Sequence, residues 1–505
     1  MATHPDVLIV GAGPTGLALA VDLARRGTRA LVVERSDGLF PGSRGKGIQP
    51  RTQEVFDDLG VLDALLAGGG TYPVGMIWKD GQRQGEHRMF DEVAATEAEP
   101  YAGFALMVPQ WRTQEILYAR LKELGGDVAF GRELVGLDQD ADGVTASFAS
   151  GAPVRARHVV AADGGRSAVR RSLGIGMTGE TVDPAPALVA DIRVTGLDRD
   201  NWHFFPPVED AAEGTGEQGG RGSRGLRGGF LGICPLPHTE DFQLAAGFAD
   251  PSAEPDLSLE GIRKLVATRT HLAPDDVTEV RWASEFRPRA AMADRFRQGR
   301  VFLAGDAAHV HSPAGGQGLN TSVQDAYNLG WKLTAVLRGE APAALLDSYE
   351  EERLPVAAQM LGLSTGIHRG ELRRGAATQQ LGLGYRGSSL AVETRDGLPE
   401  EALHAGDRAP DGTRGGVRLF DTFRGPHWTL LTVGTDAQVP DLPGIRTVRY
   451  PAYEAYGTGV FLVRPDGYVG WAGTTAEGLS EYATRTGAVT GSGRAVGSPP
   501  VPSGS

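Results

Sequence analysis

The sequence predicts an α/β protein with a Rossmann-like nucleotide-binding domain, an inserted, mainly antiparallel β-sheet domain, and a smaller α/β unit near the C-terminus. Three observations support this. The chain opens with a strand, a glycine loop, a helix and a second strand. Two more apolar strands, at 159–162 and 301–304, also end in aspartate and glycine, and alternating segments lie between them. At 505 residues the chain is too long for one ordinary core, so two or three domains are expected.

The opening unit has the pattern of a dinucleotide-binding loop. Residues 7–10 are apolar, as in a strand that is buried on both faces. Gly11, Gly13 and Gly16 follow at the spacing G-x-G-x-x-G. Gly11 permits a tight turn, Gly13 lets a pyrophosphate approach the backbone, and Gly16 lets the helix pack on the strand. A purely structural turn is the alternative, because 72 glycines in 505 residues are roughly twice the usual share.

The following helix and strand complete this unit. Apolar residues recur at helical spacing over 17–26, Gly27 ends the helix, and a second strand covers 30–33. The helix N-terminus offers N–H groups and a partial positive charge to phosphates. Glu34, at the tip of the second strand, can accept hydrogen bonds from a ribose diol. The whole arrangement therefore predicts a bound dinucleotide.

Composition excludes several other classes. The net charge of −13, without any block rich in Lys and Arg, argues against nucleic acid as a partner. Cys234 is the only cysteine, which excludes intrachain disulfides and thiolate metal clusters and fits a reducing, cytoplasmic location. No apolar run approaches the roughly 20 residues that cross a membrane, and the first strand begins too early to leave room for a signal peptide.

The segment after Glu34 is a loop rich in glycine and serine that contains Arg44. A cation beside the nucleotide loop could face a phosphate or an anionic ring, but spacing alone favours a solvated arginine. Residues 49–66 are predicted to form one helix and 113–124 another. The broken pattern over 68–103 predicts an excursion into a second domain.

Two later strands end in candidate ligand residues. The strand 159–162 ends at Asp163, and the strand 301–304 ends at Gly305 and Asp306. Open α/β sheets bind ligands at the carboxyl ends of their strands, although an N-cap aspartate is the alternative for Asp163. Together with the glycine loop, three strand ends therefore point to one edge of one sheet.

The remaining segments predict the other domains. Residues 177–286 alternate between apolar and polar and predict an antiparallel sheet, with a mobile surface loop over 213–229. A small α/β unit is predicted, with strands at 429–433 and 447–449 and a hairpin over 460–471 that turns at Pro465-Asp466-Gly467.

Three motifs occur together in this chain. They are the glycine loop with Glu34, Ala162-Asp163-Gly164 with Ser167 and Arg170, and the segment 299–309, which is extended by Gly315 to Asn320, Asp325-Ala326 and Trp331-Lys332-Leu333. With this combination the chain resembles class A flavoprotein monooxygenases, the para-hydroxybenzoate hydroxylase-like group. It looks closest to the aromatic hydroxylases of polyketide tailoring and to phenol-hydroxylase-type enzymes. The resemblance covers roughly residues 5–475.

The resemblance implies the domain organisation. It divides the chain into an FAD-binding domain (1–72, 104–176 and 287–374), a substrate-binding middle domain (73–103 and 177–286), a thioredoxin-like C-terminal domain (400–483) and a disordered tail (484–505). The C-terminal domain matches its family from residues 405–411 and contains no cysteine, so it cannot be redox-active.

The resemblance also implies the site. FAD is expected to bind non-covalently, with Glu34 on the adenosine ribose and Asp306 on the ribityl chain. Arg44 and Gln110 match positions that contact the flavin or its phosphates, and Asp163 matches an aspartate implicated in both FAD and NAD(P)H binding. Arg44 and Asp163 are the expected catalytic residues. The expected cofactor-binding residues are Gly11, Gly13, Pro14, Thr15, Gly16, Glu34, Arg35, Arg44, Gln110, Val135, Asp163, Gly305, Asp306, Pro313, Gly316, Gly318, Leu319 and Asn320. No metal site is expected, since His309 and His311 lack a third ligand nearby.

The implied reaction follows from the cofactor. The family reduces FAD with NAD(P)H, adds O2 at the flavin C4a atom and transfers one oxygen from the hydroperoxide to an aromatic substrate. The N-terminus of the helix 319–337, with Gly316 and Gly318, is placed to stabilise the anionic reduced flavin. A monomer or homodimer acting on a small aromatic molecule is expected, with no nucleic acid or membrane partner.

Alternatives to hydroxylation stay open. The same flavin machinery can perform Baeyer–Villiger oxygenation or epoxidation, and a flavin-containing protein that binds an aromatic ligand without oxygenating it is a further alternative. The sequence does not single out a base that activates the substrate: His203, Tyr72 and Arg287 are candidates, and each fits a structural role better.

Small residues in the middle domain predict a bulky, multi-ring substrate. They are Gly228, Gly229 and Gly232 on one strand and Ala245, Ala246 and Gly247 on another, with Phe204, Phe230 and Trp282 as apolar walls. Small side chains on facing strands would leave volume for a flat ring system. Glycines that merely let the sheet bend are the alternative.

Overall fold

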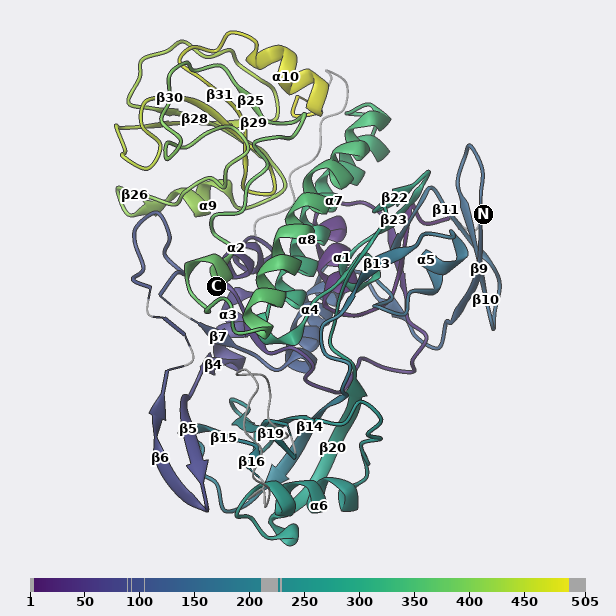
Figure 1. The fold of residues 1–505 in the computed structure, drawn as a ribbon. Helices are drawn as coiled ribbons and strands as arrows, with labels where there is room; N and C mark the ends of the chain where they lie inside the picture. The colour runs from purple at the N-terminus through teal and green to yellow at the C-terminus, as the bar shows by residue number, and fades with distance from the viewer. Residues whose placement is uncertain are drawn as a thin grey trace, which may run out of the picture.

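The computed structural model describes residues 4–88, 90–91, 93–103, 105–209, 226–227 and 229–489. Three layers are visible along the long axis of the molecule in Figure 1: a C-terminal unit at one end, a central α/β domain, and an antiparallel sheet at the other end. The central layer is built on a sheet in the order β22-β23-β12-β1-β2-β8. Its strands are β1 (Val7–Val10), β2 (Ala30–Val33), β8 (Val128–Ala129), β12 (His158–Ala161), β22 (Arg297–Gln298) and β23 (Val301–Leu303).

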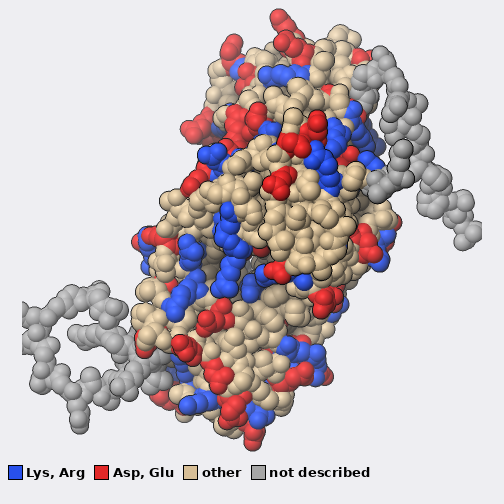
Figure 2. Space-filling view, turned by 90° about the vertical axis from the view of Figure 1, so that its right-hand side faces the viewer, with Lys and Arg blue, Asp and Glu red and all other residues tan. Residues whose placement is uncertain are grey.

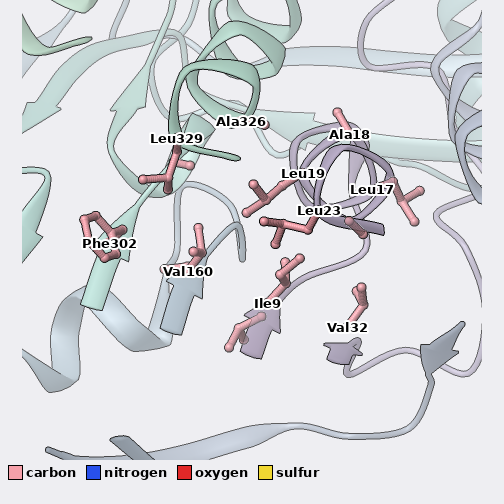
Figure 3. Close-up of a cluster of buried hydrophobic side chains, with 14 of the residues drawn as sticks. Ile9, Leu17, Ala18, Leu19, Leu23, Val32, Val160, Phe302, Ala326 and Leu329 are labelled. Carbon is pink, nitrogen blue, oxygen red and sulfur yellow. The ribbon is translucent and has the colours of Figure 1, made fainter. Parts of the chain in front are cut away.

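This central sheet is parallel except at its β22 edge. Parallel strands need helical crossovers that cover both faces, and this explains why β1, β12 and β23 are buried throughout. The helices α1 (Pro14–Arg25), α4 (Gln110–Glu123) and α7 (Gly318–Leu337) pack here. Figure 3 shows Ile9, Val160 and Phe302 of the strands facing Leu19, Leu23 and Leu329 of α1 and α7.

The helix predicted over 49–66 is wrong as one element. The chain forms α2 (Pro50–Asp58) and α3 (Leu62–Gly68), because Gly60 between them has a φ of +73°, which ends the first helix. A short helix, α5 (Ala168–Ser172), follows β12, and the Ser167 hydroxyl at its start accepts the Arg170 N–H.

The antiparallel layer is a sheet in the order β20-β14-β19-β18-β15-β5-β6, called the middle sheet below. Its strands are β5 (Val74–Lys79), β6 (Gln82–His87), β14 (Ala187–Val194), β15 (Asn201–Phe205), β18 (Leu231–Pro235), β19 (Phe242–Gly247) and β20 (Val277–Phe286). Residues 74–87 thus join the sheet formed mostly by residues 187–286, as the predicted excursion requires. Only β15 and β5 pair in parallel.

One face of the middle sheet is filled and the other faces the central domain. Helix α6 (Leu259–Arg269) packs Ile262 and Val266 against Leu188, Leu244 and Ala246. Side chains alternate between the faces of a strand, so Asp191, Gln243, Ala245, Gly232, Cys234, Trp202, Phe204 and Trp282 point to the other face. This second set is called the open face.

The predicted wall of small residues is therefore partly wrong. Ala246 is buried on the α6 side, because the alternation places it opposite Ala245, and Gly229 precedes β18 rather than lying in it. The strands β18 and β19 are neighbours in one sheet and do not face each other. Gly228 lies outside the described residues. Gly232, Ala245 and Gly247 remain on the open face.

Short strands connect the two layers. They are β3 (Gly47–Ile48), β4 (Gly70–Thr71), β7 (Leu106–Met107), β13 (Met177–Thr181), β21 (Arg289–Ala293) and β24 (His309–Val310). A separate sheet of β9 (Leu134–Gln139), β10 (Val144–Phe148) and β11 (Val154–Ala156) lies at the surface, and β16 (Val208–Glu209) pairs with β17 (Leu226–Arg227). The predicted mobile loop over 213–229 falls largely outside the described residues.

The C-terminal unit is a mixed sheet in the order β25-β31-β30-β28-β29. Its elements are β25 (Val392–Glu393), β28 (Trp428–Val433), β29 (Ile445–Tyr450), β30 (Gly459–Val463), β31 (Val469–Gly473), α9 (Leu419–Phe423) and α10 (Leu479–Thr486), with a small hairpin of β26 (Thr413–Arg414) and β27 (Val417–Arg418). β28 and β29 are joined without a helix, and the thioredoxin-like description of this unit stays a prediction.

Buried charges dock this unit onto α7 and α8 (Asp347–His368). Arg464, from the turn after β30, contacts Glu352 of α8 at 2.6 and 2.9 Å and Asp466 at 2.9 and 2.6 Å. Lys332 of α7 contacts Glu352 at 2.6 Å, and Asp466 accepts the Trp331 indole N–H at 3.0 Å. All of these side chains are buried, so the C-terminal unit is packed as part of the core.

The predicted disordered tail begins too early. Residues 484–486 belong to α10, because Tyr482, Ala483 and Ala488 are buried against Trp428 and Leu479. Residues 490–505 lie outside the described part of the chain. Among the described residues, no helix is both long and apolar enough to cross a membrane. The predicted domain boundaries remain a proposal.

Candidate functional site

Three neighbouring strand ends form the floor of the candidate site. β23, β12 and β1 are adjacent and parallel, so Asp306, Asp163 and Gly11 emerge at the same edge. Gly11 has a φ of +108°, and an added Cβ would lie 2.3 Å from the Ala162 carbonyl oxygen. At Gly13 an added Cβ would meet no atom within 4 Å. Gly11 is therefore required by packing, whereas Gly13 borders open space that a ligand can occupy.

Glu34 lies beside this loop at the end of β2. Its Oε2 accepts the Ala12 N–H at 2.9 Å and its Oε1 accepts the Ser36 N–H at 3.1 Å. These bonds orient a half-buried carboxylate next to the N-terminus of α1, where Gly13 provides no side-chain cap. The α1 N-terminus therefore keeps its N–H groups and positive dipole end for an anionic ligand.

Asp163 combines the two roles that were considered for it. Its Oδ2 accepts the N–H groups of Ala168 and Val169 at 2.7 and 3.2 Å, which caps α5. Its Oδ1 is buried without a hydrogen-bond partner, and burial raises the pKa of this carboxyl. An added Cβ on the next residue, Gly164, would meet nothing within 4 Å, so there is space beside this strand end. One oxygen is thus structural and the other is available.

Asp306 and Arg44 border a recess between the central domain and the middle sheet. Both side chains are exposed, yet the surrounding protein raises the pKa of Asp306 and lowers the pKa of Arg44. Exposure combined with such a desolvation effect is typical of side chains that line a hollow rather than a convex surface. Figure 2 shows Lys and Arg side chains gathered around a depression in the middle of one face.

Arg44 also reaches the middle sheet. Its guanidinium lies 5.0 Å from the ring centre of Phe40 and 5.8 Å from that of Trp282, and it donates to the Ser284 hydroxyl at 3.3 Å. Trp282 and Ser284 belong to β20 and point to the open face. Arg44 is therefore not a freely solvated arginine, and it connects the loop that follows Glu34 with the open face.

The N-terminus of α7 forms the remaining wall. Gly316 is left-handed, with a φ of +64°, and Gln317 provides no side-chain cap. Asn320 accepts the Gln49 N–H at 2.8 Å and donates to the carbonyls of Gly47 and Gly316, both at 2.9 Å. Asn320 thus fixes the loop in front of α7 by holding β3 and leaves the α7 N–H groups directed at the recess.

Of the other predicted cofactor-binding residues, some contact the loop that contains Arg44 and others are exposed at the surface. Gln110 accepts the Gly45 N–H at 3.1 Å, and Leu319 lies 3.5 Å from a Cβ position on Gly45, so both support the Arg44 loop. Pro313 is exposed at the start of the α7 loop, and Arg35 is exposed after Glu34. Val135 lies on β9 and is 60% exposed. Its segment is held near Glu34 by the Arg132 N–H, which donates to the Glu34 carbonyl.

A buried network behind Asp306 was missed by sequence reasoning. Asp325 accepts the Gly305 N–H at 2.9 Å, the His309 Nε2–H at 2.6 Å and the Arg353 Nε–H at 2.7 Å. Burial alone would raise the pKa of Asp325, but His309 and Arg353 hold it at about 2. The histidines that might suggest a metal are thus part of this network, and no group of metal-binding side chains occurs among the described residues.

The candidates for substrate activation separate clearly. His203 is buried on the α6 side of β15, where it bonds to Trp78 and to the Asp198 carbonyl, and Arg287 binds backbone carbonyls at the surface. Tyr72 is half-buried, stacks on Trp202 with ring centres 6.0 Å apart, and holds its hydroxyl close to Gly47. Of these three, only Tyr72 lies beside the open face.

These features fit an FAD molecule, as the resemblance implies. The glycine loop and the uncapped α1 N-terminus suit a pyrophosphate, Glu34 suits a ribose, and Asp306 is an accessible carboxylate for hydroxyl groups. The uncapped α7 N-terminus suits a developing negative charge on a ring. The open face of the middle sheet then lies across the recess from this cradle.

Comparisons with known proteins agree with this geometry. A model described as "FAD binding domain" matches residues 4–364, and one described as "Aromatic-ring hydroxylase, C-terminal" matches residues 403–489. A flavin-dependent monooxygenase of Mycobacteroides abscessus is 46% identical over 494 residues, which are 95% of this chain and 99% of the relative. A 12-dehydrotetracycline 5-monooxygenase/anhydrotetracycline 6-monooxygenase of Streptomyces rimosus is 35% identical over 521 residues, covering 94% of this chain and 97% of the relative.

A solved structure extends the likeness to the whole fold. The ternary complex of aklavinone-11 hydroxylase with FAD and aklavinone superimposes with a TM-score of 0.80 at 29% identity. The match covers 96% of this chain and 99% of that chain.

Proposed function

The chain belongs to the family of FAD-binding aromatic-ring hydroxylases, and from this premise we propose that it hydroxylates a multi-ring phenolic substrate with NAD(P)H and O2. It is a flavin-dependent monooxygenase, and FAD is its cofactor. When bound, FAD accepts a hydride from NAD(P)H and activates O2. The open face of the middle sheet is the observation that carries the proposal about the substrate.

The protein's own residues divide the remaining tasks. Glu34 would hold the adenosine ribose, Asp306 the ribityl hydroxyls, and the N–H groups at the start of α7 would stabilise negative charge on the flavin ring. Arg44 would lie at the border between flavin and substrate, because it belongs to the loop that follows Glu34 and contacts Trp282 and Ser284 of β20. The interface between the two layers would exclude water from the reacting atoms.

The open face suits a flat and wide molecule. Gly232, Ala245 and Gly247 leave its centre without bulky side chains, and Trp202, Phe204 and Trp282 surround it with half-buried rings. Aromatic rings bind flat ring systems by stacking or edge contacts. The names of two similar proteins refer to tetracycline and aklavinone substrates, which supports a multi-ring substrate here.

Substrate-stimulated oxidation of NAD(P)H tests this proposal. Tricyclic and tetracyclic phenols should stimulate oxidation with one product molecule, heavier by one oxygen atom, for each NAD(P)H consumed. Simple phenols and hydroxybenzoates should stimulate it weakly and with poor coupling. Efficient, coupled turnover of a monocyclic phenol, with none of the fused-ring compounds, would contradict the proposed substrate class.

Product structure separates hydroxylation from the other oxygenations. A ring hydroxyl seen by NMR supports the proposal, whereas a lactone or an epoxide would show Baeyer–Villiger or epoxidation chemistry instead. A Glu34→Ala variant should lose FAD during gel filtration while its circular dichroism stays unchanged. Wild-type protein that releases FMN on heating would contradict the role of Glu34, since FMN has no adenosine ribose.

A further inference from the structure

Gln380 is buried in a backbone conformation that normally belongs to glycine. It follows a short 3-10 turn (Ala376–Gln379) with a φ of +64° and a ψ of +12°, and only 1% of the residue is exposed. A side chain in this left-handed region crowds the backbone, a cost that glycine avoids. The other two non-glycine residues of the described chain with a positive φ, Asp80 and His238, are exposed in hairpin connections. A strained residue that is also buried indicates that its side chain has a task.

The amide of Gln380 joins three buried residues at the start of α7. Its Nε2 donates to Gln317 Oε1 at 2.7 Å and to the Thr321 hydroxyl at 3.2 Å. Its Oε1 accepts from Gln324 Nε2 at 2.5 Å. Gln317, Thr321 and Gln324 follow one another at steps of four and three residues, so they lie on one face of the helix. One side chain thus holds the first two turns of α7 from the side.

The segment that carries this residue also holds the loop before α7. Gln317 Nε2 donates to the Thr378 carbonyl at 3.3 Å, so its side chain is directed into the protein. Arg374 donates its Nε–H to the Ala314 carbonyl at 3.0 Å. Residues 374–380, called the clamp below, therefore fix the loop at both of its ends.

The start of α7 needs such support, because its own sequence does not order it. Gly316 and Gly318 lie on either side of Gln317 and lose much conformational freedom when they are fixed. No side chain caps the first N–H groups of this helix, and uncapped helix ends fray. Yet N–H groups stabilise a negative charge best when they are already held in place. The clamp supplies from outside the helix the order that the local sequence lacks.

We propose that Gln380 is a positioning residue for the flavin, which holds the uncapped first turn of α7 in the orientation that binds the ring of reduced FAD. The inference rests on the proposed function and adds to it a residue outside the glycine loop and α7. Reduced FAD bears the negative charge, so Gln380 should favour reduced over oxidised FAD and raise the reduction potential of the bound cofactor. The backbone strain persists because glycine at this position would relieve it only by losing the amide.

Gln380→Gly separates the backbone from the side chain, since it keeps the left-handed conformation and removes the amide. It should bind oxidised FAD about threefold and reduced FAD about thirtyfold more weakly than wild type, because the helix start is no longer preorganised. The tenfold difference corresponds to a two-electron reduction potential that is lower by about 30 mV. Fluorescence titration of the apoprotein with FAD measures the affinity, and redox titration of the FAD-loaded enzyme against a dye of known potential measures the shift.

Asp80→Gly is the matched control. Asp80 has a φ of +49° and lies in the β5–β6 hairpin at the edge of the middle sheet, so this variant relieves a comparable strain at a distant position. It should keep the FAD affinity and the potential of wild type. A purely structural role of Gln380 would likewise change the melting temperature of Gln380→Gly and leave its potential unchanged.

Gln317→Met removes the other half of the same hydrogen bond, and it provides the test if Gln380→Gly does not fold. It should lower the potential by a similar amount, and the double variant should lower it little further, because both changes remove one contact. The proposal is overturned if either folded variant keeps the wild-type potential, if Asp80→Gly shifts it equally, or if the two effects add in full.

These outcomes are distinct from failure of the proposed function, since neither measurement uses an aromatic substrate. An enzyme that hydroxylates multi-ring phenols but keeps its potential in both variants would overturn the role of Gln380 and leave the proposed function standing. A potential that depends on Gln380, in an enzyme that hydroxylates none of these phenols, would do the reverse.

Discussion

Two buried clusters of charge in this molecule differ in how they are paired. At the docking surface of the C-terminal unit, Glu352, Arg464, Lys332 and Asp466 contact one another at 2.6–2.9 Å, and none has a buried polar atom without a partner. At the open face of the middle sheet, Lys46 and Asp191 are also buried, yet their charged atoms have no hydrogen-bond partner of good geometry and do not pair with each other.

The difference separates a permanent contact from a binding surface. Buried charges that pair with each other need no further group, and removing one partner leaves the remaining charge buried without compensation. Charges that lack partners lower stability and raise affinity for a complementary ligand. We therefore expect substitutions in the first cluster to destabilise the protein and substitutions in the second to stabilise it.

The largest expected effect is at the docking surface. Arg464→Met would remove the group that holds Glu352 and Asp466, and we expect a loss of about 3–5 kcal/mol in the free energy of unfolding. Urea unfolding followed by circular dichroism measures this loss. Arg386→Met, which removes an exposed pair with Asp407, should cost less than about 1 kcal/mol. Equal losses in the two variants would remove the distinction between buried and exposed pairs.

Asp191→Asn should instead raise the free energy of unfolding. Burial raises the pKa of Asp191 to about 6. An aspartate in the unfolded chain has a pKa of about 4, so the folded state binds the proton more tightly, and stability falls as the pH rises from about 4 to 6. The asparagine variant lacks this penalty and should be more stable than wild type by about 2–3 kcal/mol at pH 7.5.

The same pair of proteins should be nearly equal in stability at pH 4. Unfolding midpoints in urea at the two pH values test this dependence. A variant that is less stable than wild type at pH 7.5 would show that the Asp191 carboxylate has a stabilising partner after all, and the contrast between the clusters would fail.

The paired carboxylate of Asp325 should change the stability of the protein with pH in the direction opposite to Asp191. Its pKa of about 2 lies below the unfolded value of about 4, so its contribution is present above pH 4 and is lost as the pH falls through 2. The stability difference between wild type and Asp325→Asn should therefore shrink by about 2 kcal/mol between pH 5 and pH 2.5. A difference that stays constant over this range would mean that the pairing with His309 and Arg353 does not depend on the carboxylate charge.

Arg44→Ala should have the smallest effect on stability. Arg44 is exposed and forms no salt bridge with any described residue, so its loss should change the free energy of unfolding by no more than about 0.5 kcal/mol. Stopped-flow measurements should nevertheless show slower flavin reduction by NAD(P)H, because the side chain lies between the nucleotide-binding loop region and β20. Unchanged reduction kinetics would make Arg44 a surface residue only.

The contrast between the clusters also explains what the sequence could predict. Local spacing was sufficient to place the glycine loop, Glu34, Asp163 and Asp306 at one edge of the sheet, because each directly follows the end of a buried strand. It was sufficient for α7 as well. The break at Gly60 was missed because an apolar stripe continues across it, although Gly60 itself is visible in the sequence as a helix-ending residue.

Long-range placement could not be predicted in this way. The faces of β18 and β19 depend on register, so Ala246 was assigned to the wrong side. Asp325 lies 16 residues from His309 and 28 from Arg353, and no local pattern links the three. Lys46 stands in a loop where nothing in the sequence shows that its ammonium would be buried.

Helix α7 makes the two ends of the molecule one cooperative unit. Its first turn would form a wall of the proposed FAD site, and Asn328, Trp331 and Lys332 further along bond to Glu352 and Asp466 at the docking surface of the C-terminal unit. A helix of 20 residues spans about 30 Å. Detachment of the C-terminal unit would strip this helix of its buried partners, so release of the cofactor and melting of the remote unit should occur in a single transition.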